Sequence, residues 1–224
     1  REAIKSCYSS KVGPTISDLI RELGLLPIRS SWDHETRMAL LRRLKLFTEG
    51  TCGMAVNGED SVDREELFHG IVSIDLSHMR DVNSRSILSN LLMKIIYDCC
   101  VNRGEQARLR HVLLIEEAQN ILPPRRPENP RTIGERILGE MRKYGEGIVI
   151  VSQFPSAVSQ DVIKNTAIRI IHTIRSGDDI KTLGDCTSIN EEQRLCLASL
   201  SPGEAVVNLP NRSANLFVKV VADP

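Results

Sequence analysis

Residues 111 to 117, HVLLIEE, place two adjacent carboxylates directly after an unbroken aliphatic run. A short apolar run of this kind predicts a strand buried in the core of the fold. Glu116 and Glu117 would repel each other, and burying a charge without a partner is costly. The stretch therefore indicates a strand that leaves the core at these two acids, where a ligand or a partner offsets their charges.

Strands and helices alternate from Gly70 onward. Further apolar runs that predict strands are GIVSIDLS (70–77), GIVIVSQ (147–153) and AIRIIHTI (167–174), and helical patterns occupy 84–100 and 130–145. Strands that are apolar throughout are covered on both faces, which favours a parallel sheet with crossover helices. The end of the chain, 203–224, predicts a hairpin or two edge strands around the turn LPNRS. The predicted class is α/β.

The first part of the chain has helical signals instead. PTISDLIRELG (14–24) offers Thr15 as an N-cap and Gly24 as a stop, and a second helical pattern runs from Ser31 to a stop at Gly50. GTCGMAVNGEDSVDREE (50–66) is typical of a loop. We therefore expect a helical appendage at 1–65 and the α/β core at 66–224.

Composition narrows the function classes. The 224 residues are 41% hydrophobic and 26% charged, as in a globular protein, and the formal net charge of zero excludes an overall basic field for nucleic acid. Six cysteines without a C-x-x-C favour reduced thiols in a cytoplasmic protein. We expect no structural zinc and no membrane segment. The chain begins at Arg1 in mid-pattern, which suggests a piece of a larger protein.

The acid pair has a chemical interpretation. Ligands of parallel α/β sheets bind at the carboxyl ends of the strands. One carboxylate there can hold Mg²⁺ through water while its neighbour orients or deprotonates an attacking water. This division of labour suits hydrolysis of a nucleotide γ-phosphate. The alternative is that Glu116 and Glu117 only begin a helix, where the helix dipole stabilises acids.

Two further pairs of polar residues each have both a functional and a purely structural interpretation. Ser152 and Gln153 end the predicted strand 147–153, where a Gln can contact the γ-phosphate or its water, or can simply terminate the strand. Arg142 and Lys143 end a predicted helix. They are either a solvated cap or the source of an arginine finger for the nucleotide of a neighbouring subunit.

The order of three segments resembles the HerA-type branch of the HerA/FtsK DNA-pumping ATPases. These segments are VLLIEEAQNILP (112–123), the stretch 135–183 with its E-x-R-K-x-G and SQ-x-P motifs, and LASLSPGEAVV (197–207). RMALLRRLKLF (37–47) and GIVSIDLSHM (70–79) also resemble that family, so the resemblance covers about the whole chain. It implies a RecA-like P-loop ATPase core with a largely parallel sheet.

The resemblance also implies roles for individual residues. Glu116 and Glu117 match the Walker B acids, with Glu116 toward Mg²⁺ and the nucleotide and Glu117 as the catalytic base. Gln153 matches the sensor at the strand end, and Arg142 matches the arginine that acts in trans. Family members are ATP-driven hexameric rings that move along double-stranded DNA, and HerA proteins process DNA ends with a nuclease partner.

The sequence departs from the family pattern at two points. Gln119 stands where a His is usual, and no segment matches the phosphate-binding motif G-x-x-x-x-G-K-[ST]. We expect that loop upstream of Arg1. Its strand would lie in the sheet between strands 147–153 and 167–174, so this chain should leave two strand edges unpaired there.

Three other function classes stay open from the residues alone. One is a conjugation or secretion ATPase of related fold, and another is a non-catalytic oligomerisation module. A metal-dependent nuclease is the third, although no further cluster of Asp, Glu or His follows the acid pair at useful spacing.

Overall fold

A computed structural model describes residues 1–58, 63–79, 81–125, 128, 132–187, 189–212 and 214–221, with the backbone alone for Ile133. The chain divides into two compact units, Arg1–Ile96 and Tyr97–Pro224, and the boundary in the sequence falls within helix α5. The domain boundary that we predicted near residue 65 stays a prediction.

The described residues of the first unit form helices joined by loops, and they contain no strand. It contains α1 (Glu2–Ser10), α2 (Ile16–Leu25), α3 (Ser31–Lys45), α4 (Gly50–Val56), the 3₁₀-helix η1 (Arg64–Phe68) and most of α5 (Val82–Arg103). Thr15 caps α2 as predicted: its backbone N–H donates to Asp18 Oδ2 at 2.9 Å, and its hydroxyl accepts from the Asp18 N–H. The bonds from Thr15 lower the pKa of Asp18 to about 2.

Two predictions for this unit were wrong. The stretch from Gly50 begins α4, although we predicted a loop there; residues 59–62 of that loop lie outside the described residues. Cys52 and Gly53 are buried in α4, so packing has overridden a glycine-rich sequence with low helix propensity. The predicted strand at 70–77 is absent. Ile71 and Ile74 are exposed, and the Asp75 carboxylate accepts a hydrogen bond from the Ser77 N–H in a turn.

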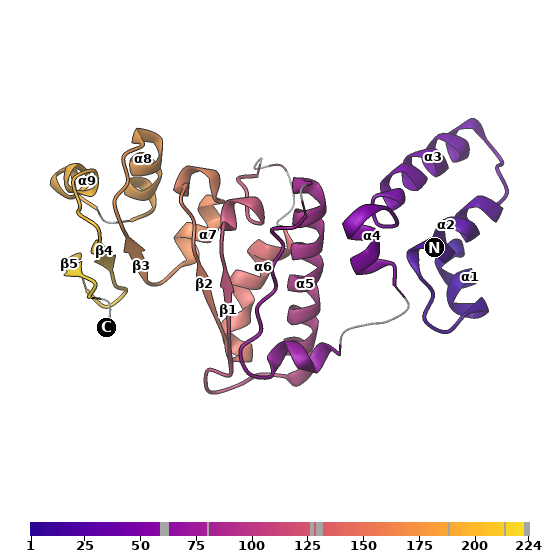
Figure 1. Ribbon diagram of the computed structural model, residues 1–224, viewed down its shortest axis with the longest axis horizontal. Coiled ribbons are helices and arrows are strands. Elements are labelled where there is room, and N and C mark those ends of the chain that lie inside the picture. The colour runs from indigo at the N-terminus through magenta and orange to yellow at the C-terminus, as the bar shows by residue number, and fades with distance from the viewer. Residues whose placement is uncertain are drawn as a thin grey trace. The chain divides into compact units, whose positions relative to one another are not determined.

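The second unit contains five strands among its described residues, arranged in two sheets (Figure 1). The strands are β1 (His111–Ile115), β2 (Glu146–Ile150), β3 (Arg169–Ile171), β4 (Glu204–Asn208) and β5 (Leu216–Lys219). The helices are α6 (Ile133–Glu140), α7 (Gln160–Asn165), α8 (Gly177–Cys186) and α9 (Glu191–Leu197), with 3₁₀-helices η2 (Ala118–Asn120), η3 (Met141–Tyr144) and η4 (Pro155–Ala157).

The first sheet positions the candidate site. β1 and β2 are parallel, with His111 opposite Glu146 and Ile115 opposite Ile150. Both strands therefore end at the same edge, as predicted. β3 pairs antiparallel with β4, and β4 with β5, which forms the predicted C-terminal hairpin. Our prediction of parallel pairing for β3 was wrong, because β3 pairs with β4 of the hairpin and not with β2.

The two sheets are not joined in the part of the chain that the structure describes. β2 has no strand partner other than β1, and β3 has none other than β4. The expected interruption between β2 and β3 is thus confirmed, and it leaves both strands with an unpaired edge. Ile171, Leu183, Ile189, Leu197 and Val206 form a separate core beneath the second sheet.

One face of the first sheet is open, although we predicted that both faces would be covered. Val112 and Leu114 of β1 are 47% and 55% exposed, and Val149 of β2 is 45% exposed. The alternate residues face inward, and Ile115 is buried. The apolar runs therefore predicted the strands correctly, but they did not predict that one face of the sheet would be exposed to solvent in this chain. No helix among the described residues has the length and apolarity needed to cross a membrane.

Candidate functional site

The acid pair lies at the carboxyl end of β1, where the chain leaves the sheet. Val151 N donates to Ile115 O at 2.9 Å, and Ala118 N donates to Val151 O at 3.0 Å. Glu116 and Glu117 lie between these two attachments and bulge out of the ladder. Glu117 has φ 48° and ψ 45°, and it is the only described non-glycine residue with positive φ. A left-handed conformation costs such a residue about 1–2 kcal/mol, which is typical of functional sites.

Gln153 meets Glu117 across the edge of the sheet. Its side-chain Nε2 donates to Glu117 Oε1 at 2.8 Å, and both side chains are exposed. Because β1 and β2 are parallel and in register, their carboxyl ends bring together residues 36 positions apart. Two of the predicted site residues are therefore in direct contact.

Glu116 is the candidate for a metal ligand. Its carboxylate is exposed and has no hydrogen-bond or ion-pair partner among the described residues. Carboxylate oxygen is a ligand that Mg²⁺ prefers, and Mg²⁺ usually takes only one or two carboxylates and fills its remaining positions with water and phosphate oxygens. The donor set at this edge fits such an ion.

Gln119 and Ser152 complete the site, and our sequence reasoning did not assign them a role there. Gln119 Nε2 donates to Glu117 Oε2, and Ser152 Oγ donates to Gln119 Oε1 at 2.6 Å. Ser152 precedes Gln153 at the strand end, and Gln119 follows Glu117 by two positions. The shared strand edge places Ser152 beside the acid pair, but the contact with Gln119 also needs the left-handed turn at Glu117, for which the sequence carries no signal.

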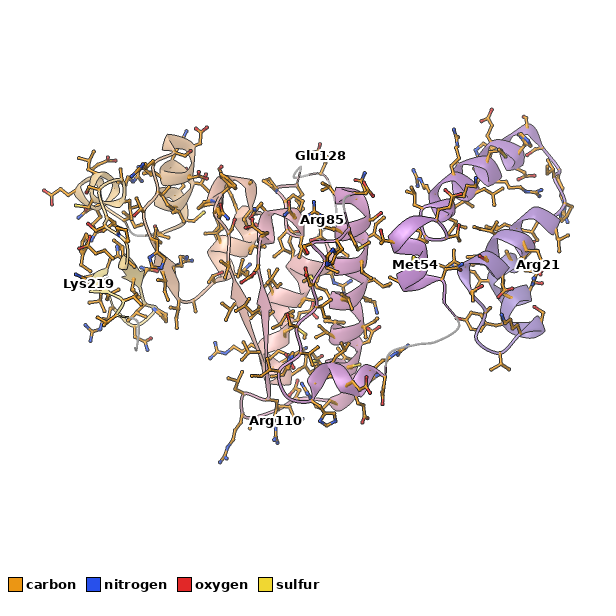
Figure 2. The ribbon with its side chains drawn as sticks, in the orientation of Figure 1. Arg21, Met54, Arg85, Arg110, Glu128 and Lys219 are labelled. Carbon is orange, nitrogen blue, oxygen red and sulfur yellow. The ribbon has the colours of Figure 1, made fainter. Side chains whose placement is uncertain are left out.

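Arg142 lies at the opposite end of the same sheet. It belongs to η3, which precedes β2, whereas Glu117 follows β1. The five residues of the strand separate the two ends by roughly 16 Å. In Figure 2, Arg110 marks the end near Arg142 and Glu128 marks the other end. The structure therefore does not bring Arg142 to the Glu117 of its own chain.

Gly145 fixes the E-x-R-K-x-G segment at that end. Its φ is +76°, and a Cβ atom there would lie 2.6 Å from Arg108 O. Gln106 N donates to Lys143 O at 2.9 Å, so the loop before β1 holds η3 by backbone bonds. Arg142 and Lys143 are exposed, and Lys143 Nζ lies 4.9 Å from the centroid of the Tyr144 ring.

A cluster of charged residues around the buried carboxylate of Glu135 anchors the segment that follows the acid pair. Arg125 Nε donates to Glu135 Oε2 at 3.0 Å, and Arg125 Nη2 lies 3.1 Å from Asp161 Oδ2. Ser159 Oγ donates to Glu135 Oε1 at 2.6 Å. Burial alone would raise the pKa of Glu135, but the hydrogen bonds from Ser159 and Thr132 and the charge of Arg125 outweigh it and lower that pKa.

A second buried carboxylate braces the end near Arg142. Glu146 Oε2 lies 2.7 Å from His111 Nδ1, and Glu146 Oε1 accepts from Arg103 Nη2 at 2.7 Å. The Cys100 thiol donates to the same carboxylate at 3.2 Å. Burial, and then this hydrogen bond, raise the pKa of Cys100 to about 12. The cluster ties α5 to the first residues of β1 and β2.

Sequence comparison finds helicases among the relatives of this chain. It is 34% identical to the DNA double-strand break repair helicase HerA of Pyrococcus furiosus over 100 residues, which are 43% of this chain and 18% of that protein. Identity to the HerA helicase of Saccharolobus solfataricus is 26% over 148 residues, or 64% and 30% of the two chains. A probable helicase of Methanocaldococcus jannaschii is 26% identical over 145 residues, or 62% and 28%. The chain thus spans less than a third of each relative.

Solved structures share the fold. VirB4 of Thermoanaerobacter pseudethanolicus aligns with all of this chain and 62% of its own, with a TM-score of 0.69 and 14% identity. The genome packaging NTPase B204 of Sulfolobus turreted icosahedral virus 2 aligns over 73% and 74%, with a TM-score of 0.54 and 14% identity. No protein-family model matches the chain. These comparisons confirm the resemblance to HerA-type ATPases and the RecA-like α/β core with helices.

Proposed function

We propose that this chain, a relative of the HerA-type ATPases, carries the hydrolytic half of the site of an ATP-driven translocase of double-stranded DNA. The observation that carries the proposal is the contact between Glu117 and Gln153 at the carboxyl ends of two parallel strands. Ligands of α/β sheets bind at this edge. The relatives named as DNA repair helicases support DNA as the substrate along which the protein moves.

The proposed reaction is attack of water on the γ-phosphorus of ATP. The water oxygen forms the new bond, the bond to the β–γ bridging oxygen breaks, ADP leaves, and the proton of the water passes to Glu117. Gln153 contacts the γ-phosphate or the water. Bound Mg²⁺ would supply charge neutralisation at the phosphates, and Glu116 would hold it, directly or through water.

The remaining parts of the proposed site come from elsewhere. The β- and γ-phosphates need a phosphate-binding loop, and this chain contains no such motif. Arg142 is proposed to act on the nucleotide of a neighbouring subunit, because the sheet separates it from the candidate site of its own subunit. That arrangement requires a homo-oligomer, and we propose a hexameric ring. A nuclease partner in DNA end processing is proposed from the resemblance to HerA.

The test is Glu117→Gln in the full-length protein. Gln is nearly the same size and cannot accept the proton of water, so ATP binding should persist while hydrolysis falls by about 10²–10⁴-fold. Glu128→Gln is the matched control, because Glu128 is an exposed carboxylate at the same end of the sheet and takes no part in the proposed reaction (Figure 2). It should leave turnover unchanged.

Two results would point to other functions. Unchanged ATP turnover in Glu117→Gln would refute the role of Glu117 and would favour a non-catalytic oligomerisation module. Loss of turnover with no dependence of the parent activity on DNA would favour the conjugation or secretion type of ATPase. DNA-stimulated hydrolysis that Glu117→Gln abolishes is the expected result.

A further inference from the structure

The carboxylate of Glu117 is held at both oxygens by neutral amides. Oε1 accepts from Gln153 Nε2 at 2.8 Å, and Oε2 accepts from Gln119 Nε2. Gln153 comes from the end of β2, whereas Gln119 lies in η2, directly after the acid pair. The two amides therefore approach the carboxylate from two different elements and restrict its rotation.

Gln119 is itself oriented by Ser152. Ser152 Oγ donates to Gln119 Oε1 at 2.6 Å, and it accepts from the Phe154 N–H at 3.2 Å. An amide oxygen only accepts and an amide nitrogen only donates, and an ionised carboxylate only accepts. The bonds can therefore run in one direction alone, from the Phe154 N–H through Ser152 and Gln119 to Glu117. Gln119 and Ser152 are half-buried, which shields this relay from competing water.

The backbone beneath the relay is held in a strained shape. Glu117 keeps its left-handed conformation between the attachment of Val151 to Ile115 and that of Ala118 to Val151. Strain of this kind persists only where the surrounding structure determines it from several sides. The backbone bonds fix the position of the Glu117 Cα atom, and the two amides fix the positions of its carboxylate oxygens.

We infer that Gln119 and Ser152 are positioning residues for Glu117, acting as a relay that contains no group titrating near neutral pH. The inference rests on the proposed role of Glu117 as the base. Each carboxylate oxygen has a second lone pair for water, so an amide bond orients the base without blocking it. Because Gln119 is uncharged at every physiological pH, the orientation of the base should not change with pH.

The first experiment measures ATP hydrolysis by the full-length protein. Gln119→Ala should lower kcat by about 10- to 100-fold, as expected for a lost hydrogen bond to a charged group, with little change in KM. Ser152→Ala should lower it less. Because Ser152 acts through Gln119, the double variant should be no worse than Gln119→Ala alone. Losses that multiply in the double variant, or a kcat near the parent value in Gln119→Ala, would overturn the inference.

The second experiment gives the relay a titratable group. In Gln119→His, a neutral imidazole can donate to Glu117 and accept from Ser152, so turnover should be largely kept at high pH. The protonated ring has no acceptor for Ser152 and pairs its charge with the base. We expect kcat to fall as the ring becomes protonated, with a pKa above the ordinary histidine value of about 6.5 because the Glu117 carboxylate favours the charged ring, and the parent pH profile should lack this limb. A merely structural role for Gln119 would leave the pH profile of this variant parallel to that of the parent.

Controls separate this inference from the proposed function. Gln160→Ala removes an exposed amide on α7 and should have no effect on kcat. Thermal unfolding and nucleotide binding of each variant show whether it is folded. Turnover that survives Glu117→Gln refutes the proposed function. Turnover that is lost in Glu117→Gln and unaffected by Gln119→Ala and Gln119→His refutes the relay alone.

Discussion

Gln153 Nε2 donates a 2.8 Å hydrogen bond to Glu117 Oε1, and this bond joins the carboxyl ends of β1 and β2. The contact makes Gln153 a group that can respond to the base and to the phosphate from one position. The Gln153 amide nitrogen has a second N–H, which can donate to a phosphate oxygen while the first keeps its bond to Glu117. The two residues are thus positioned so that one amide can contact the nucleotide and orient the proposed base together.

The first prediction concerns Gln153 in the full-length protein. Gln153→Ala should lower kcat for ATP hydrolysis by about 10- to 100-fold, as expected for a lost hydrogen bond to a charged group. Gln153→Glu should be worse, because a second carboxylate would repel both Glu117 and the phosphates. Steady-state hydrolysis measures both effects. Equal activity of Gln153→Glu and the parent would contradict the sensor role.

The second prediction concerns Arg142. Arg142→Ala should abolish most hydrolysis, and mixing this variant with Glu117→Gln should restore part of it, because some interfaces then combine an intact Glu117 with an intact Arg142 of the neighbour. Hydrolysis by the mixture is compared with that of each variant alone. Arg136→Ala, an exposed arginine of α6, is the control and should remain active. A mixture no more active than its components would rule out action in trans.

The third prediction concerns the buried pair of Arg125 and Glu135. Arg125→Met would leave Glu135, whose side chain is 2% exposed, without its cation. The free energy of unfolding of the chain at pH 7 should fall by about 1–3 kcal/mol, measured by urea denaturation. Arg136→Met is the exposed control. A change as small as that of the control would show that the pair contributes nothing to stability.

The same pair predicts a pH dependence. The pKa of Glu135 is lowered in the folded chain, so its contribution to stability is fully present above its unfolded pKa of about 4.3 and is lost as the pH falls through the folded value. The difference in stability between the parent and Arg125→Met should therefore shrink in acid. A difference that stays constant from pH 7 to below that range would contradict the assignment.

The fourth prediction concerns thiol reactivity. Burial and the bond to Glu146 raise the pKa of Cys100 to about 12, so this thiol should react very slowly with a disulfide reagent at neutral pH. Cys196 is exposed on α9 and should react first. Cys196→Ser should remove the fast phase, and Cys100→Ser should leave it. A fast phase that disappears with Cys100→Ser would place Cys100 at the surface.

Local signals predicted much of the fold. The Thr15 cap, the helical period of α5 and the apolar runs of β1 and β2 each depend on residues close in sequence. The predictions failed where contacts with residues distant in sequence determine the secondary structure. α4 forms in a glycine-rich stretch because Cys52 is buried by packing, and the run at 70–77 forms no strand because an apolar pattern does not supply a hydrogen-bonding partner.

In the candidate site, too, some contacts could be predicted from the sequence and others depend on the folded backbone. Glu117 and Gln153 could be placed together because parallel strands end at one edge, and the structure joins them. The bond from Ser152 to Gln119 depends on the left-handed turn at Glu117, which brings η2 back over the end of β2. Glu rarely adopts that conformation, so no propensity predicts it. The opposite position of Arg142 follows from the element order and the parallel pairing, because η3 precedes β2 whereas Glu117 follows β1.

The last prediction concerns the 224-residue chain by itself, which should bind ATP negligibly. Most affinity for the β- and γ-phosphates in P-loop sites comes from the backbone N–H groups and the Lys of the loop, and this sequence has no such motif. Glu116 and Glu117 offer only repulsion to an anionic nucleotide, softened at most by a weakly held Mg²⁺. Arg142 does not compensate, because the sheet separates it from the acids. Calorimetric titration of ATP and Mg²⁺ into the purified chain should give no heat of tight binding. A micromolar Kd would mean that the phosphates bind elsewhere on this chain, and the roles proposed for Glu116, Glu117 and Gln153 would have to be given up.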